Sequence, residues 1–231
     1  MGNKSRIIPI GGFCSVAKEL ERRGLRDGSL PFDWVMTDLD SVSRLLERQF
    51  DRLFCPDALR RKEGMPHVVA HKNYYFDFYH DFPEHVSIEQ VLPVVRAKYE
   101  RRIQRIYEWL GEADRILFIH YVLTDADRLK EEIDRFFRVV TKLSNAKVDL
   151  LVVAVRDERI DPCICKLDRV TVIQVDSDPG QNVCRKFIQK NKSVQNWVGE
   201  YVQNFYSRRR QLKNRYLYFQ KKIRKKKSWH H

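Results

Sequence analysis

Residues 116–122 read ILFIHYV and residues 150–155 read LLVVAV, and both are continuous apolar runs. Between them, residues 125–143 carry their apolar side chains at the spacing of an amphipathic helix. A third apolar run follows at residues 170–175. Apolar strands that alternate with helices are typical of a parallel sheet covered on both faces. We therefore expect an α/β fold, a three-layer sandwich with a mainly parallel sheet.

The start of the chain predicts another strand of this sheet, followed by a tight turn and a helix. Residues 6–10 are mostly apolar and lead into Gly11 and Gly12. From residue 15 to residue 23 the apolar side chains recur at helical spacing, and Gly24 is expected to end that helix.

The middle of the chain predicts two further helices and an insertion. Residues 40–50 have one apolar helical face, and residues 87–109 form a long helical pattern that starts with a capping serine. Residues 67–82 are rich in aromatic and β-branched side chains, which predicts a hairpin insertion that turns near Lys72. A long basic C-terminal helix is expected over residues 182–222, with an apolar face that docks on the sheet.

The net charge of +13 is concentrated near the C-terminal end of the sequence. Residues 208–227 contain eleven Lys or Arg and no acidic residue, which leaves the rest close to neutral. Because no linker interrupts the earlier sequence, we expect a single α/β domain over residues 1–205 and a basic helical extension over residues 206–231. Such a tail is able to bind nucleic acid or an anionic surface, although it is also a common solvated end.

The composition favours a cytoplasmic protein without a metal or cofactor. No apolar run reaches the roughly 18 residues of a membrane-spanning helix, and the first residues lack the apolar block of a signal peptide. The five cysteines are an odd number at irregular spacing, which suits a reducing compartment. Cys163 and Cys165 lack a second pair and ligand-spaced histidines, so a zinc site is not expected there.

Cys14 lies where the turn after the first strand opens the first helix, and it is the leading candidate for a functional centre. The positive end of the helix dipole and the unpaired amides there favour the thiolate form of a cysteine. The same amides, with the turn residues Gly11, Gly12 and Ser15, would hold an oxyanion next to the attacked carbon. The alternative is that Cys14 is a small buried core residue, as most free cysteines are.

A cysteine nucleophile needs a base, and two histidines are expected where they could face Cys14. His80 follows an aromatic strand and directly precedes Asp81, while His120 lies near the carboxyl end of a predicted strand. Ligands of parallel sheets collect at the carboxyl ends of the strands. For His120 the alternative is a hydrogen-bonded core histidine. Asp33 and Asp81 are among the aspartates that could orient a histidine.

Three short motifs resemble a known family when they are taken in order. They are IGGFCSVA at residues 10–17, GSLPFDW at residues 28–34 and FDFYHDF at residues 76–82. With this order and spacing, the chain resembles a family of bacterial proteins described as papain-like cysteine peptidases, over roughly residues 6–155.

The resemblance implies that Cys14 is the nucleophile, that His80 is its partner and that Asp33 or Asp81 orients the histidine. Such a centre would make the protein a cysteine-dependent hydrolase that acts on an acyl, ester or amide bond of a small-molecule or peptide substrate.

Two other functions stay open. The same centre with a thioester donor would suit an acyltransferase or a related enzyme of cell-surface polysaccharide biosynthesis, and Arg96, Arg101 and Arg102 could then contact phosphates. Alternatively, the chain is a non-enzymatic binding module whose tail from Arg208 to Lys227 meets nucleic acid or an anionic surface.

Overall fold

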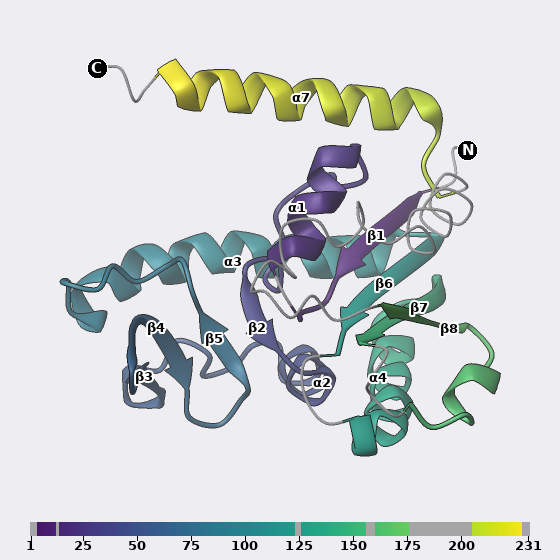
Figure 1. The fold of residues 1–231 in the computed structure, drawn as a ribbon, viewed down its shortest axis with the longest axis horizontal. Coiled ribbons are helices and arrows are strands. Elements are labelled where there is room, and N and C mark those ends of the chain that lie inside the picture. Colours follow the sequence, from purple (N-terminus) through teal and green to yellow (C-terminus); the bar gives the residue numbers. More distant parts are fainter. Residues whose placement is uncertain (1–3, 13, 123–125, 156–159, 176–204, 228–231) are drawn as a thin grey trace.

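The structure, a computed structural model, describes residues 4–12, 14–122, 126–155, 160–175 and 205–227. Its strands form two separate sheets of four strands each, one parallel and one antiparallel. Figure 1 shows the parallel sheet beside α1 and α4, with the antiparallel sheet at the far side of α2.

The parallel sheet has the order β1-β6-β7-β8 and confirms the expected α/β fold. Its strands are β1 (Ser5–Pro9), β6 (Arg115–Tyr121), β7 (Lys147–Val155) and β8 (Val170–Val175). Ile8 pairs with Phe118, and Phe118 pairs with Leu150 on the next strand. The carboxyl ends of β1 and β6 therefore lie next to each other, and they open toward the turn that follows β1.

Helices cover both faces of this sheet, as the three-layer expectation requires. Alternate strand residues belong to two cores, because successive side chains of a strand point to opposite faces. One core joins Ile7, Leu117 and Leu151 to α1 (Cys14–Arg23). The other core joins the opposite face to α2 (Leu39–Glu47), α3 (Ile88–Glu112) and α4 (Leu129–Leu143).

The predicted hairpin is part of a larger antiparallel sheet with the order β2-β5-β4-β3. The strands are β2 (Val35–Thr37), β3 (Leu59–Lys62), β4 (Met65–His71) and β5 (Phe76–Phe78). The turn near Lys72 joins β4 to β5, as expected. The strands β2 and β3 have only three and four residues, too few for a clear alternating pattern.

The helices begin and end at capping residues that the sequence itself indicates. Ser87 caps α3 by accepting a hydrogen bond from the Gln90 backbone amide at 3.3 Å. Gly24, with a φ of 74°, ends α1, since only glycine takes this conformation without strain. Three 3-10 turns complete the described elements: η1 (Pro56–Ala58), η2 (Ala126–Arg128) and η3 (Ile164–Lys166).

The C-terminal helix α7 (Arg208–Lys227) lies across the outer side of α1 (Figure 1). The helix expected over residues 182–222 therefore starts at Arg208 within the described part, and residues 176–204 lie outside it. Phe205 and Tyr206 are both buried in the core next to α1. A domain boundary between these two residues stays a prediction. None of the helices in the described ranges is long and apolar enough to cross a membrane.

Candidate active site

The turn after β1 is wedged between the ends of two strands. Gly11 and Gly12 have φ angles of 90° and 89°. A Cβ atom on Gly11 would lie 2.3 Å from Cγ2 of Thr37, and one on Gly12 would lie 2.4 Å from Cβ of Tyr121. Both contacts are far inside van der Waals distance, so glycine is required at both positions. The turn is thereby held between the carboxyl ends of β2 and β6.

Cys14 is the first residue of α1, and Ser15 is the second. The first backbone N–H groups of an α-helix have no acceptor within the helix, and they form the positive end of its dipole. The backbone position of Cys14 is therefore the one at which a thiolate is favoured and at which amides are available to an oxyanion.

His120 is the histidine next to this turn. Its Nδ1 donates a hydrogen bond to the Ile10 carbonyl oxygen at 2.9 Å. A carbonyl only accepts, so the proton of the neutral ring is on Nδ1 and the lone pair is on Nε2. Burial lowers the pKa of His120, although the Ile10 carbonyl and the nearby charge of Asp38 raise it. The imidazole is therefore neutral near pH 7, which is the state that a general base needs.

Asp38 directly follows β2 and adds a negative charge to the same region. Its carboxylate caps α2 by accepting a hydrogen bond from the Ser41 backbone amide at 2.7 Å. Burial, together with the charges of Asp38 and Asp40, raises the pKa of Glu132 to about 7. Asp38 thus acts electrostatically on both His120 and Glu132.

His80 lies in a different place. Its ring meets the Trp34 ring edge to face, with centroids 6.4 Å apart, and the side chain is exposed. Trp34 directly precedes β2 and Thr37 ends it, so three residues at ~3.3 Å each place the two residues roughly 10 Å apart along the strand. Because Thr37 is the residue that contacts Gly11, His80 lies near the opposite end of β2 from the Cys14 turn.

Asp33 and Asp81 are close in sequence to Trp34 and His80, and their carboxylates bind partners other than a histidine. Asp33 is 1% exposed, forms an ion pair with Arg26 and accepts a hydrogen bond from the Leu30 amide at 2.7 Å. Burial raises the pKa of Asp33, while Arg26 lowers it. Asp81 pairs with Lys98 and accepts a hydrogen bond from the Tyr99 hydroxyl at 2.8 Å.

The structure thus brings His120 and the backbone of the Cys14 turn together, and it places His80, Asp33 and Asp81 around α3. Sequence reasoning missed Asp38 and Glu132. The cap at Asp38 had a local signal, an aspartate three residues before Ser41, but its nearness to His120 depends on how β2 packs.

A hollow of about 580 Å³ opens on the antiparallel sheet. Its lining is basic and aromatic: Arg60, Arg61, Lys62, Glu63, Ala70, His71, Tyr74, Tyr75 and Asp77. Thr37 and Phe76 form the last pair of this register, so Asp38 and Tyr75 are the residues that lie directly beyond it. The backbone amide of Tyr75 also donates to Ser41 Oγ at 2.9 Å. Burial raises the pKa of Tyr75, and the charges of Asp77 and, least, Asp38 raise it as well. The hollow therefore reaches the neighbourhood of Asp38.

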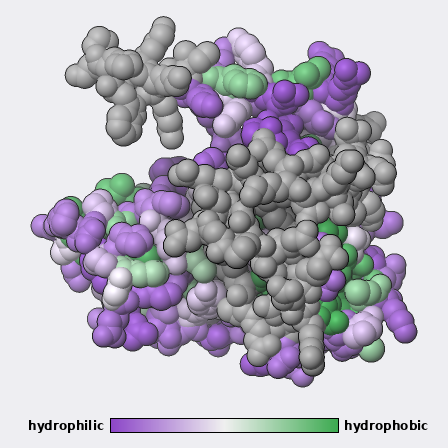
Figure 2. All heavy atoms as spheres, viewed as in Figure 1, coloured by the Kyte–Doolittle hydropathy of each residue, from purple (hydrophilic) through white to green (hydrophobic). Residues whose placement is uncertain are grey.

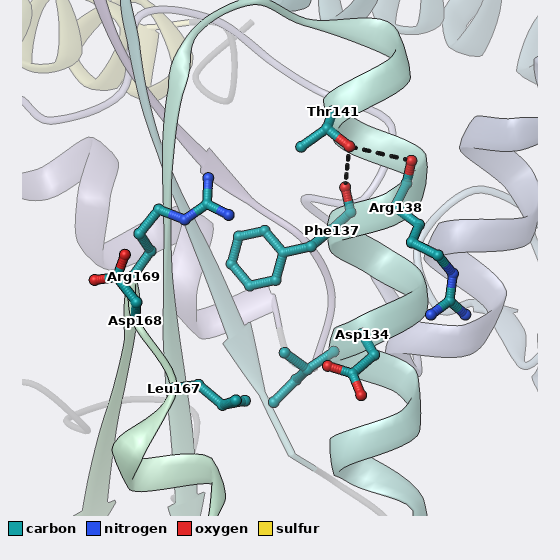
Figure 3. A pocket seen from close by; sticks show the side chains of 8 residues that line it. Asp134, Phe137, Arg138, Thr141, Leu167, Asp168 and Arg169 are labelled. Carbon is teal, nitrogen blue, oxygen red and sulfur yellow. Dashed lines mark hydrogen bonds between the residues drawn. The ribbon is translucent and has the colours of Figure 1, made fainter.

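A second hollow, of about 400 Å³, lies between α4 and the residues that precede β8 (Figure 3). The Arg169 guanidinium lies 5.0 Å from the centroid of the Phe137 ring there. Because Arg169 precedes β8, this hollow is at the amino end of the strands, opposite the Cys14 turn. Within the parts of the chain that are described, no three His, Cys, Asp or Glu residues gather as a metal site.

Comparisons with known proteins agree with the motifs. The chain is 26% identical over 166 residues to an uncharacterised protein of Acanthamoeba polyphaga mimivirus, an alignment that covers 63% of this chain and 74% of the relative. This relative is viral, so these comparisons do not support the expected bacterial setting. No solved structure matches the chain. A family profile described as "Putative papain-like cysteine peptidase" matches residues 5–158, two thirds of the sequence, and the chain belongs to this family.

Proposed function

We propose that the protein is a cysteine-dependent hydrolase that cleaves an acyl, ester or amide bond, with Cys14 as nucleophile and His120 as general base. The observation that supports this most is the hydrogen bond from His120 Nδ1 to the Ile10 carbonyl, beside the turn that leads to Cys14. It leaves Nε2 of a neutral ring available to take a proton. In this proposal His120 takes the role that the family resemblance assigned to His80.

The reaction would begin when Nε2 of His120 takes the thiol proton of Cys14. The thiolate then attacks the carbonyl carbon of the substrate, and the first backbone amides of α1 stabilise the resulting oxyanion. When the intermediate collapses, the leaving amine or alkoxide takes the proton from His120, and Cys14 holds the acyl group as a thioester. Water, deprotonated by His120, hydrolyses the thioester and returns the free thiol.

Asp38 would stabilise the imidazolium that forms during each proton transfer. Its charge already raises the pKa of His120 against the effect of burial. Glu132, with a pKa raised to about 7, adds a group that changes charge near neutral pH in the same region. We therefore expect catalysis to depend on the ionisation of more than one group around pH 7.

The hollow on the antiparallel sheet would bind the substrate, since Tyr75 connects it to Asp38. Its exposed guanidinium at Arg60 and its tyrosines suit a small-molecule or peptide substrate that carries an anionic or aromatic group. A reducing compartment such as the cytoplasm would keep the nucleophile active, and the described cysteines Cys55, Cys163 and Cys165 are free thiols.

Acyl transfer shares the thioester intermediate and differs only in the acceptor. Of the three arginines expected to hold donor phosphates, Arg96 donates to the Phe54 carbonyl at 2.9 Å and Arg102 lies over the Tyr99 ring, while Arg101 is exposed. We therefore place hydrolysis ahead of acyl transfer and of a role in polysaccharide biosynthesis.

The test is the rate of Cys14 alkylation by iodoacetamide across pH, followed by peptide mass spectrometry. In the wild-type protein we expect an apparent thiol pKa below the ordinary value of about 8.5. His120→Ala should raise this apparent pKa, and His80→Ala, the matched control, should leave it unchanged. A rise in the His80 variant alone would assign the base to His80, and an ordinary thiol pKa in all three proteins would reject the enzyme.

A further inference from the structure

The helix α7 is fixed to the body at its amino-terminal end. Asp27 is the anchor, since it accepts hydrogen bonds from the Tyr206 hydroxyl at 2.5 Å and from Asn214 at 2.9 Å, and it pairs with Arg210. Asn214 also donates to the Gly24 carbonyl at 3.1 Å. The first two turns of α7 are therefore held against the end of α1, and Figure 1 shows the rest of the helix extending away.

An apolar stripe runs along the exposed side of α7. Leu212, Tyr216 and Phe219 follow each other at intervals of four and three residues, so they share one helix face. Their side chains are 56%, 62% and 50% exposed. Figure 2 shows apolar side chains, in green, among hydrophilic ones along this edge of the molecule. Three large apolar side chains exposed on one helix face favour a surface that contacts something else.

The charge of α7 restricts what that contact is. The helix carries eleven Lys or Arg and no acid, and cations both precede and follow the stripe along the sequence. A second copy of the chain would bring two such helices together, and their like charges would oppose the association. The partner must therefore be anionic and must also receive apolar side chains.

We propose that α7 docks this protein on the surface of an anionic lipid bilayer. A bilayer interface accepts apolar side chains below its headgroups, while Lys and Arg contact the anionic lipids. A nucleic acid would use the cations through its phosphates, and it would leave Leu212 without a partner. The combination of both features on one exposed helix favours the membrane surface, and this docking does not depend on the chemistry of Cys14.

The direct test is sedimentation of the full-length protein with vesicles of phosphatidylcholine that contain roughly 30% phosphatidylglycerol. We expect binding to these vesicles and none to pure phosphatidylcholine. The variant Leu212→Gln/Tyr216→Gln/Phe219→Gln should bind at least about tenfold more weakly. Because these side chains are exposed, the fold should be unchanged in circular dichroism. Val94→Gln, which alters a 73% exposed apolar side chain on α3, is the matched control and should bind like the wild type.

The electrostatic contribution has its own variant. Lys221→Gln/Lys222→Gln removes two exposed charges and should weaken vesicle binding by about tenfold or more. The control variant Lys142→Gln/Lys147→Gln removes two exposed charges outside α7, and it should bind the vesicles as the wild type does.

Two kinds of result would overturn the proposal. One is the absence of charge-dependent vesicle binding, seen either as equal binding to charged and neutral vesicles or as no binding to either. The other is tight binding to duplex DNA or single-stranded RNA that the triple Gln variant retains, with vesicle binding absent, which would assign α7 to nucleic acid.

Discussion

The two ends of β2 carry the same kinds of residue and present them differently. At the carboxyl end, His120 is buried and neutral next to a glycine turn, with its Nδ1 proton fixed by a carbonyl. At the amino end, His80 is exposed against Trp34, and the nearby carboxylates are engaged by Arg26 and Lys98. Two histidines near the same strand thus differ in burial and in partners, and these differences, not the neighbouring aspartate in the sequence, set the chemical environment of each ring.

Removing each histidine in turn should separate the two ends of β2. His120→Ala should lower kcat/KM for p-nitrophenyl acetate, used as a probe ester, by roughly 10²–10⁴-fold, the usual contribution of a general base. His80→Ala should leave the rate close to that of the wild type. A large loss in the His80 variant instead would reverse the assignment of the two ends.

The amino end of β2 should prove structural. Asp33→Ala removes one of the two carboxylates that pair with the buried Arg26 guanidinium, the other being Glu21, and it also removes the acceptor of the Leu30 amide, so it should lower the free energy of unfolding by about 1.5–3 kcal/mol in urea titrations. Asp134→Ala, which breaks the exposed pair with Lys130, serves as control and should change it by less than about 0.5 kcal/mol. Equal effects of the two variants would contradict the structural role.

The glycine turn at the carboxyl end can be tested by matched substitutions. Gly64→Ala should lower the free energy of unfolding by about 1–2 kcal/mol, because the φ of 70° at this position is unfavourable for alanine. The added Cβ brings no further cost, since no atom lies within 4 Å of it. Gly11→Ala should cost about 1–3 kcal/mol more, since its Cβ would overlap Thr37. Urea midpoints measure the difference, and similar costs at both sites would mean that the turn is not wedged against β2.

The buried histidines predict the direction of the pH dependence. Burial lowers the pKa of both His71 and His120, so the unfolded chain binds more protons below its ordinary pKa of about 6.5. The stability that these groups contribute is present above that pH and is lost as the pH falls toward their lowered values. Between pH 7 and pH 5 the urea midpoint of the wild type should fall, and His120→Gln should make this fall smaller. In the control His67→Gln, which alters an exposed histidine, the fall should be as large as in the wild type.

The smallest effect is expected at Asp38. Asn is as good an N-cap as Asp, so Asp38→Asn should leave the stability of α2 nearly unchanged. Loss of the charge removes a group that raises the pKa of His120, so the imidazolium becomes less stable and Cys14 alkylation near pH 7 should slow several-fold. An unchanged alkylation rate would remove Asp38 from the site.

Much of the fold could be predicted because its signals are local. The apolar runs of β6, β7 and β8, the glycine that ends α1 and the serine that caps α3 each act within a few residues. The same holds for the position of His120 near the end of a strand. These features confirm the α/β fold, and they follow from side-chain periodicity and capping alone.

The rest depends on contacts between distant segments. The role of Asp38 follows from the packing of Thr37 against Gly11, which brings β2 to the end of the parallel sheet. Asp81 points inward to Tyr99 while its neighbour His80 is exposed, and nothing in the motif gives these directions. Short strands such as β2 carry too few residues to be recognised before their partners are known.

The docking of α7 on the far end of α1 has a geometric consequence. The helix α1 has ten residues, so at ~1.5 Å per residue its two ends are about 15 Å apart. Gly24 at one end touches α7, and Cys14 starts the other end. In a protein resting on a bilayer through α7, the backbone of Cys14 would therefore lie at most about 15 Å along α1 from the point where α1 meets the docked helix. The contact with the docked helix and the start of α1 are thus at the two ends of one ten-residue helix, so docking through α7 would fix the distance between the lipid surface and the Cys14 turn.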